Sequence, residues 1–555
     1  MKRLLFIFIV SFFPALAGAV QLPDNMFFRA MNDEMQRSLK ELRLKDHPNP
    51  YYIAYWLFHS RNLTIGANMG TLRPQVDNPQ PKGDLRIVAF VSVGSDKQDG
   101  LGFAGEEYPY WREIELPAAW GALGYESIRQ YLWKLTDRAY LNAVNLYKKK
   151  QSYKQKKNIV DTLPDVIPAA PARFQEDIAP FEQPQMQRLK DEVRAISALG
   201  KTKPFVESFE AALSVQPVHT YFLNSRQAFA QYATTQVSLE LKAAFRQPDG
   251  KTAEASSVLW LKDTSAPEME RAKTFAQDFL QKIHQAHGAT SGEAYVGPVL
   301  LKPRAAARLM RRAVLNDMQR SKPFLLAYSE DDAQAGKLYK KQKVRVSTDL
   351  LTVYDRPLQR TFEGIALARF APVDSEGVAA EDLTLIQNGR VKDFPLTQRP
   401  LTKNHRSNGH AYMDNLYGPR ERLTNVLVEP KEQWTDAQME EKLRQRCREL
   451  GLAYGYILHQ ADPSGDLGIE RLYTADGRKE TVLNLKWDGN FFTQRDLRNV
   501  LAVGGEKQLA DNDRSSGVTI APSILLQEVE LVPREHKPHR QPFLEKPKIE
   551  TVSKK

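Results

Sequence analysis

Two histidines, His284 and His287, have a spacing that suits metal binding. Three positions of separation place both imidazoles on one side of a helix, and neutral imidazole is a good zinc donor. Two donors do not complete a zinc site, and the usual alternative for such a pair is exposure near a helix end. The sequence has no HExxH motif, P-loop, Rossmann glycine series or G-x-S-x-G elbow. It therefore gives no support for an ordinary zincin, a nucleotide-binding protein or a serine hydrolase.

A second candidate site is a polar loop that follows the middle of the C-terminal half. It combines imidazole, guanidinium and amide groups, which could contact a ligand from one surface. The candidate ligand-contacting residues are His405, Arg406, Asn408 and His410. We identify no catalytic residue in the sequence. We also find no set of side chains with enough donors to form a metal site.

The segment 383–394, which precedes this loop, contains the clearest sequence pattern of a turn. Leu383–Gln387 reads as a strand, Asn388-Gly389 follows, and the chain leaves through Arg390–Phe394. Asn-Gly accepts positive φ at both turn positions, so this segment predicts a tight β-hairpin. The carboxylates of Asp374 and Glu376, further upstream, are expected to shape a turn. A glycosidase would need a carboxylate pair at a separation that a sequence does not give.

The remaining periodicities alternate between helix and strand, which predicts an α+β protein. The expected helices are 24–42, 128–146, 189–199, 269–283, one that starts near 303, and 435–450. The expected strands are 51–57, 63–67, 86–93, 221–223, 236–245, 295–301 and 521–531.

At 555 residues the chain is too long for a single core. We expect a mixed α/β N-terminal domain and a β-rich C-terminal domain, followed by a basic, proline-rich tail that contains His536 and His539. A proline-rich stretch in the first domain is expected to be a linker or an extended surface loop. The expected boundaries are 20–290, 291–532 and 533–555, with the proline-rich stretch at 162–184.

Residues 1–19 have the pattern of a signal peptide. Lys2 and Arg3 precede an apolar run from Leu4 to Phe13, and small residues lead to an expected cleavage site after Ala19. A single membrane anchor is the alternative, but the run is shorter than the ~20 apolar residues that a spanning helix needs. We expect an exported protein, periplasmic or extracellular, without an integral membrane span in the mature chain.

The net charge of +11 does not indicate nucleic-acid binding, because much of it lies in a lysine-rich helix end and in the tail, without interleaved aromatic residues. Weak attraction to anionic lipid or an envelope polymer stays open. The only cysteine, Cys447, cannot form an intrachain disulfide. It shares a helical face with apolar residues and is expected in the core.

The order of several phrases resembles the C-terminal domain of the TldD/PmbA (TldE) family. Those phrases are 372–377, 388–389, 406–410 and 521–531, and the segments 29–38 and 50–53 resemble an exported TldD-related subgroup. The resemblance implies two domains and a dimer that encloses a cavity and handles unfolded peptide. The family's catalytic members are zinc peptidases, whereas its other members are metal-free partner subunits.

The resemblance also locates the zinc motif of the catalytic members, HExxxH, on the helix after Gly297–Leu301. Here Arg311, Arg312 and Asn316 occupy the corresponding positions. Arginine has no lone pair to donate because its guanidinium stays protonated. A unit charge 4 Å from a dication costs roughly 8 kcal/mol at an effective dielectric of 20. We therefore expect no cofactor, and zinc only if ligands lie elsewhere.

Four arginines form one stripe of this helix: Arg304, Arg308, Arg311 and Arg312. At 100° per residue, apolar residues occupy the opposite face. The simpler interpretation is a solvated face over a packed one. The functional interpretation is a basic wall for an acidic peptide or a partner subunit.

These observations lead to one main hypothesis and two alternatives. The main hypothesis is an exported, metal-free partner subunit that handles peptide beside a TldD-like catalytic subunit or a second copy of itself. Strand addition to an exposed sheet edge would be its physical mode of peptide binding. The first alternative is an active metallopeptidase with unrecognised ligands. The second is an envelope module that binds peptide or polymer without catalysis.

Overall fold

A computed structural model gives the fold of most of the chain. It is 28% helix and 39% strand, so the expected α+β class with many strands is confirmed. Residues 1–20, which include the expected signal peptide and Ala19, and residues 535–555, which include His536 and His539, lie outside the described residues. The structure describes 21–73, 84–103, 111–117, 124–181, 185–248, 250, 252–319, 325–326, 337–340, 344–414, 418–460, 468–487, 493–514 and 517–534.

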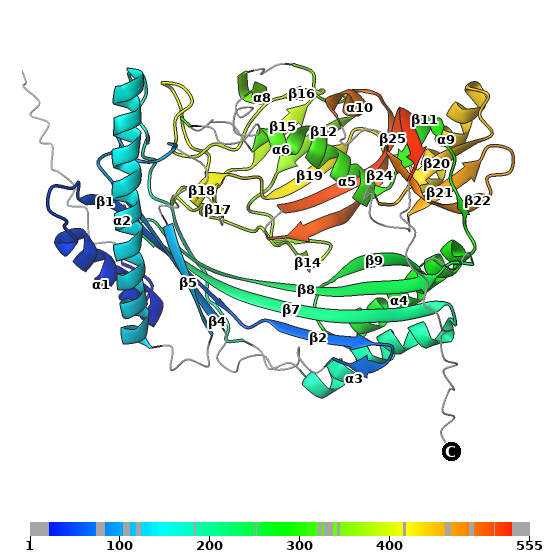
Figure 1. Cartoon of the computed structure of the whole chain (residues 1–555), viewed down its shortest axis with the longest axis horizontal. Coiled ribbons are helices and arrows are strands. Elements are labelled where there is room, and N and C mark those ends of the chain that lie inside the picture. Colours follow the sequence, from blue (N-terminus) through cyan, green and yellow to red (C-terminus); the bar gives the residue numbers. More distant parts are fainter. Residues whose placement is uncertain are drawn as a thin grey trace, which may run out of the picture.

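One curved sheet of nine strands forms the N-terminal half (Figure 1). Its main path runs β3-β2-β7-β1-β4-β5, and β8 pairs with β7, β9 and β6. The two longest strands, β7 and β8, pair antiparallel over nearly their whole length and run beneath much of the C-terminal half in Figure 1. The strands are β1 (Pro50–Ser60), β2 (Leu63–Asn68), β3 (Thr71–Leu72), β4 (Asp84–Val93), β5 (Trp111–Pro117), β6 (Arg173–Gln175), β7 (Val206–Asn224), β8 (Phe229–Arg246) and β9 (Thr252–Leu261).

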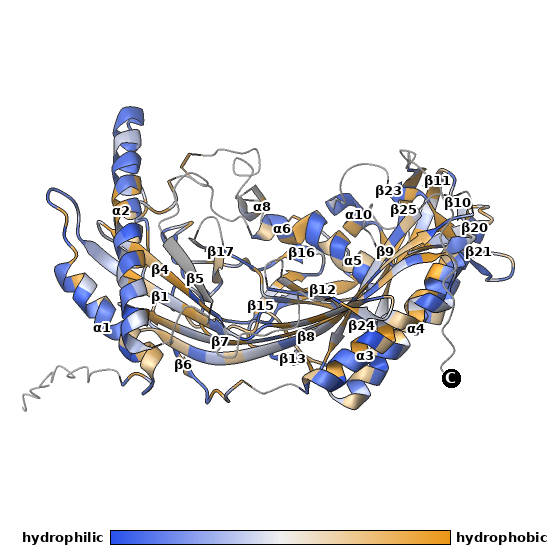
Figure 2. Cartoon of the chain, turned by 60° about the horizontal axis from the view of Figure 1, so that its bottom comes forward, coloured by the Kyte–Doolittle hydropathy of each residue, from blue (hydrophilic) through white to orange (hydrophobic). Residues whose placement is uncertain are grey.

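Helices cover the outer face of this sheet at both ends. At one end, α1 and α2 pack on Ile53, Tyr55 and Leu57 of β1. At the other end, α3 and α4 pack on β7 and β8 through residues such as Phe209 and Leu239. In Figure 2, α3 and α4 carry both polar and apolar residues, and the buried apolar residues pack against the sheet. The bounds are α1 (Met26–Glu41), α2 (Tyr125–Lys157), α3 (Met186–Ala198), the 3₁₀ helix Leu199–Thr202, and α4 (Ala266–His287).

The inner face of the same sheet packs against the C-terminal half. Successive side chains of a strand point to opposite faces, so Trp56 on β1 and Phe222 on β7 face away from the helices. Both belong to a buried cluster that includes Val373 of the C-terminal half. The two halves are therefore joined through the inner face of the N-terminal sheet.

The C-terminal half is built on a sheet of twelve strands in the order β10-β22-β21-β20-β11-β25-β19-β12-β15-β16, with β23 and β24 paired to β25. Its core continues into α5 and the turn that follows it. The strands are β10 (Thr290–Ser291), β11 (Tyr295–Leu301), β12 (Leu351–Asp355), β15 (Leu383–Gln387), β16 (Arg390–Val391), β19 (Asn425–Pro430), β20 (Tyr454–Leu458), β21 (Ile469–Tyr473), β22 (Lys479–Leu483), β23 (Leu485–Trp487), β24 (Val500–Asp513) and β25 (Gly517–Pro533).

Shorter elements complete this half. Two separate hairpins are β13 (Thr361–Phe362) with β14 (Ile365–Ala366), and β17 (Ala411–Asp414) with β18 (Gly418–Glu421). The helical segments are α5 (Pro303–Met310), a π-helical turn (Arg311–Leu315), α6 (Asn316–Met318), α8 (Lys337–Lys340), α9 (Asp436–Glu449) and α10 (Gln494–Arg498). Among the described residues, no helix combines the length and apolarity that crossing a bilayer requires.

The proline-rich stretch 162–184 runs along the surface and is fastened to both halves. Its backbone N–H groups at Val166 and Ile167 donate to Asp96 O and Gln398 O. Further on, β6 pairs in parallel with β8. The stretch is thus an extended loop held by main-chain hydrogen bonds where the structure describes it.

Candidate functional site

The helix that carries the zinc-motif positions contains a π turn. The backbone N–H of Asn316 donates to Arg311 O, an i to i+5 hydrogen bond. In a regular α-helix these two residues would point about 140° apart. The wider π turn reduces that angle, and such turns are frequent at functional sites. The backbone therefore presents Arg311 and Asn316 towards a common side.

Arg311 is held against the neighbouring strand β24. Its Nη2 lies 3.1 Å from Asp511 Oδ2 and 3.3 Å from Thr519 Oγ1 on β25. Arg312 is exposed and Asn316 is half-buried. The π turn consequently directs the Arg311 guanidinium towards the side on which the zinc motif would bind a dication. This guanidinium is already paired with Asp511.

The residues at this turn do not fit zinc. Zinc requires thiolate, neutral imidazole or carboxylate donors, and the three positions offer two guanidinium groups and an amide. Within the described part of the chain, no group of three His, Cys, Asp or Glu side chains could hold a metal ion. Asp511 supplies one carboxylate, and Arg311 occupies it.

The arginine stripe forms contacts inside the protein rather than a continuous open wall. Arg304 Nη2 donates to Val258 O of β9 at 2.6 Å, which links α5 to the N-terminal sheet, and burial lowers the pKa of Arg304. Arg311 joins β24, as described above. Arg304 therefore connects α5 to β9, and Arg311 connects the end of α5 to β24.

The loop 405–410 directs most of its polar groups to its own backbone. His405 Nε2 lies 2.6 Å from Thr397 O. The Asn408 side chain accepts from Leu396 N–H and donates to Phe394 O. Arg406 is exposed and forms a bidentate pair with Glu381. Within this loop the structure leaves Arg406 as the residue whose side chain reaches solvent.

His410 lies in the core, beside a buried carboxylate. Its Nδ1 lies 2.9 Å from Asn408 O, and its Nε2 lies 3.3 Å from Asp355 Oδ2. Both side chains are 0% exposed. The backbone N–H and the hydroxyl of Thr424 donate to the same carboxylate. This cluster joins β12 to the segment that leads into β17.

Asp374 and Glu376 shape a turn, as expected from the sequence. Asp374 accepts hydrogen bonds from the backbone N–H groups of Glu376, Val378 and Ala411. Glu376 Oε2 accepts from Gln398 N–H at 2.6 Å. Burial, and then the neighbouring Asp374 carboxylate, raise the pKa of Glu376 to about 8. The two carboxyl groups therefore hold together three segments of the C-terminal half.

This turn makes stability depend on pH. Folded Glu376 keeps its proton to about pH 8, whereas the unfolded chain releases it near pH 4.3. Between these values the unfolded state binds fewer protons, so the free energy of unfolding falls as pH rises. Between pH 5 and 8 we expect wild type to lose at least about 1 kcal/mol relative to Glu376→Gln in urea unfolding.

The comparison with Glu376→Gln removes titrations that the two proteins share. Burial lowers the pKa of His219 to about 4, so folded His219 loses its proton first and stability rises with pH up to about 6.5. That contribution has the opposite sign and is present in both proteins. A constant stability difference across the pH range would contradict the role given to Glu376.

The remaining histidine pair and the cysteine have structural surroundings. His287 stacks on Phe205 at a centroid distance of 3.9 Å and its Nδ1 lies 2.7 Å from Arg246 O. His284 stacks on the same ring at 5.7 Å. Cys447 is fully buried, as expected, and burial raises the pKa of its thiol to about 11. None of these groups is placed as a metal ligand.

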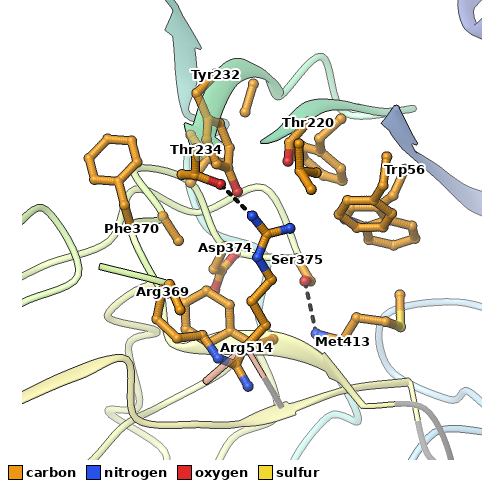
Figure 3. A pocket seen from close by; sticks show the side chains of 18 of the residues that line it. Trp56, Thr220, Tyr232, Thr234, Arg369, Phe370, Asp374, Ser375, Met413 and Arg514 are labelled. Atoms are coloured by element: carbon orange, nitrogen blue, oxygen red, sulfur yellow. Dashed lines mark hydrogen bonds between the residues drawn. The ribbon is translucent and has the colours of Figure 1, made fainter. Parts of the chain in front are cut away.

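A cavity of about 560 Å³ lies between the two halves and was not predicted from the sequence. Its floor is the inner face of the N-terminal sheet, where Trp56, Thr220 and Tyr232 point inwards (Figure 3). Its roof includes Arg369 and Arg514 from the C-terminal half. The only signal for this cavity in the sequence was that alternate residues of the expected strands 51–57 and 221–223 face the same side of the sheet. That alternation does not identify the distant segment that covers them.

Comparison with known proteins agrees with this architecture. Residues 293–532 match the family model described as the PmbA/TldA metallopeptidase C-terminal domain, so this part of the chain is a C-terminal domain of the PmbA/TldD family. No curated protein matches the sequence significantly.

Three crystal structures share the fold of most of the chain, and at their level of identity the likeness concerns the fold alone. A putative modulator of a DNA gyrase from Thermotoga maritima has 13% identity and a TM-score of 0.60, covering 91% of this chain and 100% of its own. TldE from Thermococcus kodakarensis has 14% identity and a TM-score of 0.56, with the same coverage. A putative modulator of DNA gyrase from Bacteroides thetaiotaomicron has 13% identity and a TM-score of 0.57, covering 91% and 98%.

Proposed function

We propose that this chain is an exported, zinc-free protein of the TldD/PmbA type that binds peptide and leaves hydrolysis to another subunit. The match of residues 293–532 to the PmbA/TldA metallopeptidase C-terminal domain supports this proposal. The first 19 residues have the charge and hydropathy pattern of an export signal. On this proposal the protein acts outside the cytoplasm, as a partner of a metal-bearing relative or of a second copy.

The ion pair at the π turn is the single observation that carries the zinc-free part of the proposal. Arg311 brings a permanent positive charge to the motif position, and Asp511 fixes that charge there at 3.1 Å. A dication at 4 Å from the guanidinium would be repelled by roughly 8 kcal/mol at a dielectric of 20. Apparent binding energies of good structural zinc sites are only about 10 to 16 kcal/mol. Loss of the imidazole donors removes most of the compensating attraction.

The cavity between the halves supports the peptide-binding part. It falls in the size range of ordinary ligand sites and combines aromatic walls with a few polar groups. Strand addition at β9 has less support, because side chains already use the outer edge of that strand. Arg304 donates to Val258 O and Gln460 donates to Ser256 O. A peptide pairing with β9 would have to displace both.

Metal analysis with activity assays tests the proposal. Protein purified from its native host should contain substoichiometric zinc, retain peptides, and show no peptidase activity that chelation abolishes. Stoichiometric zinc with chelator-sensitive cleavage would establish the peptidase alternative instead. Co-purification of a subunit that carries HExxxH would support the partner role, whereas purification without any second subunit would favour a lone envelope binding module.

A further inference from the structure

The cavity between the halves has a regular aromatic and hydroxyl floor. Cross-strand pairing places Trp56 beside Phe222, and Thr220 beside Tyr232, on adjacent strands. All four side chains line the cavity, because each belongs to the inward-facing set of its strand. The floor therefore offers apolar rings with hydroxyl groups between them.

The roof of the cavity is cationic. Arg369, Arg422 and Arg514 come from three different segments of the C-terminal half and lie in this roof, whereas Arg86 comes from β4 and belongs to the floor. Asp374 is the one carboxylate among the described residues that line the cavity. Its oxygens already accept three backbone N–H groups. The lining thus carries four guanidinium groups and one carboxylate that the turn uses.

Arg514 is the best-defined of these cations. Its Nη2 donates to Thr234 Oγ1 at 2.8 Å and its Nε donates to Gln236 Oε1 at 3.1 Å. Both acceptors are uncharged, so they orient the guanidinium without neutralising it. Gln236 is itself fixed by donation to Asn512 O. Figure 3 shows Arg514 extending from the roof towards Thr234 and Tyr232, with its guanidinium inside the lining.

The guanidinium groups also act on one another. Burial, and then repulsion from Arg369, lower the pKa of Arg514. Burial lowers the pKa of Arg369 and Arg422 lowers it further, whereas the carboxylates of Asp513 and Asp355, which lie outside the lining, raise it in part. Arginine nevertheless remains protonated in proteins. The cavity therefore concentrates like charges, and a bound anion would relieve their repulsion.

We propose that this cavity binds the carboxylate of a short peptide, with Arg514 and Arg369 facing the carboxylate and the Trp56–Phe222 floor facing an apolar side chain. This inference rests on the proposed peptide-binding function and names the chemical group that is recognised. Arginine matches a carboxylate through two parallel N–H···O hydrogen bonds. The carboxylate comes either from the peptide C-terminus or from an acidic side chain.

Equilibrium dialysis against three peptide pools separates the sources of the carboxylate. All peptides are N-acetylated pentapeptides. The first pool lacks Asp and Glu and has a free C-terminal carboxyl group, the second is the same pool with a C-terminal amide, and the third is amidated but contains one Glu. Retained peptides are quantified by mass spectrometry. The wild-type chain should retain the first pool, the third pool or both at least about tenfold better than the second, since charge-assisted hydrogen bonds are lost with the amide.

Variants of Arg514 test the assignment of the cation. In Arg514→Gln, the ratio of retained carboxylate peptides to retained amidated peptides without Glu should fall close to one. Arg514→Lys keeps the charge but loses the planar fork, so it should retain a reduced preference and provides the test if the Gln variant does not fold. Arg194 is exposed and pairs with Asp191 on α3, so Arg194→Gln is the matched control and should behave as wild type.

The possible failures can be told apart. Equal retention of all three pools would overturn the carboxylate site and leave the peptide-binding function standing. Failure to retain any pool would overturn both. A carboxylate preference that survives in folded Arg514→Gln would remove Arg514 from the site. Competition by inorganic phosphate at the same concentration as the peptides would show a general anion site and overturn the assignment to a peptide carboxylate.

Discussion

A double substitution, Arg311→His with Asn316→His, is expected to raise zinc affinity at least about 100-fold above that of the wild-type chain, which corresponds to about 2.7 kcal/mol. The π turn directs both positions towards a common side, as its i to i+5 hydrogen bond shows. The substitution removes the guanidinium that would repel the metal by roughly 8 kcal/mol at 4 Å and a dielectric of 20. It also releases Asp511, which lies 3.1 Å from Arg311, as a third donor beside two imidazoles.

Competition with a chromophoric chelator measures this gain, and single variants show its cause. Asn316→His alone adds one donor but keeps Arg311, so its zinc affinity should stay near that of wild type. Arg311→Ala removes the repulsion without adding a donor and should gain little. If Asn316→His alone bound zinc as tightly as the double variant, the guanidinium would not be the obstacle. In that case the zinc-free part of the proposed function would lose its physical basis.

Local signals in the sequence were sufficient for many individual elements. Tyr295–Leu301 is a strand at the expected bounds, and Asn388-Gly389 has positive φ at both turn positions. Thr435 and Gln438 form a capping box at the start of α9, where the sequence predicts that a helix begins. These features depend on neighbours within a few residues, so a single sequence contains the information that determines them.

Features that depend on distant segments could not be predicted in the same way. The inner face of the N-terminal sheet has apolar residues such as Trp56 and Phe222, but nothing near them in sequence indicates that Val373 covers them. Arg514 lies 280 positions from its acceptor Thr234. The π turn also escaped prediction, because a one-residue change in hydrogen-bond register leaves the apolar periodicity of a short helix nearly unchanged.

The candidate loop 405–410 illustrates a second limit. The sequence gives the donors and acceptors of His405, Asn408 and His410, but not the direction in which they point. In the structure they bond chiefly to nearby backbone groups and to Asp355. An Asn side chain can hydrogen-bond to nearby backbone groups in place of a ligand. The residue types predicted contacts with a ligand, whereas in the folded loop the same groups stabilise the loop itself.

Asp355→Ala is expected to lower the free energy of unfolding by about 2 to 5 kcal/mol, because at least two buried donors lose their acceptor at about 1 to 3 kcal/mol each. Asp355 is 0% exposed and accepts from the backbone N–H and hydroxyl of Thr424 while its Oδ2 lies 3.3 Å from His410 Nε2. Removing the carboxylate leaves the backbone N–H and the hydroxyl of Thr424 buried without their acceptor. Asp349→Ala is the matched control, because Asp349 is exposed and pairs with Arg345 at the surface; it should change stability by less than about 1 kcal/mol.

The same variant connects the core to the cavity. His410 directly precedes β17, and Tyr412 of that strand lines the cavity. If Asp355 fixes β17 through His410, Asp355→Ala should weaken retention of carboxylate peptides under conditions where the protein is still folded, although residue 355 does not line the cavity. Urea unfolding gives the stability change, and dialysis at low temperature gives the binding change. Equal loss of stability in Asp355→Ala and Asp349→Ala would show that the buried cluster contributes no more than a surface pair. In that case there would be no reason to expect that Asp355 affects binding in the cavity through β17.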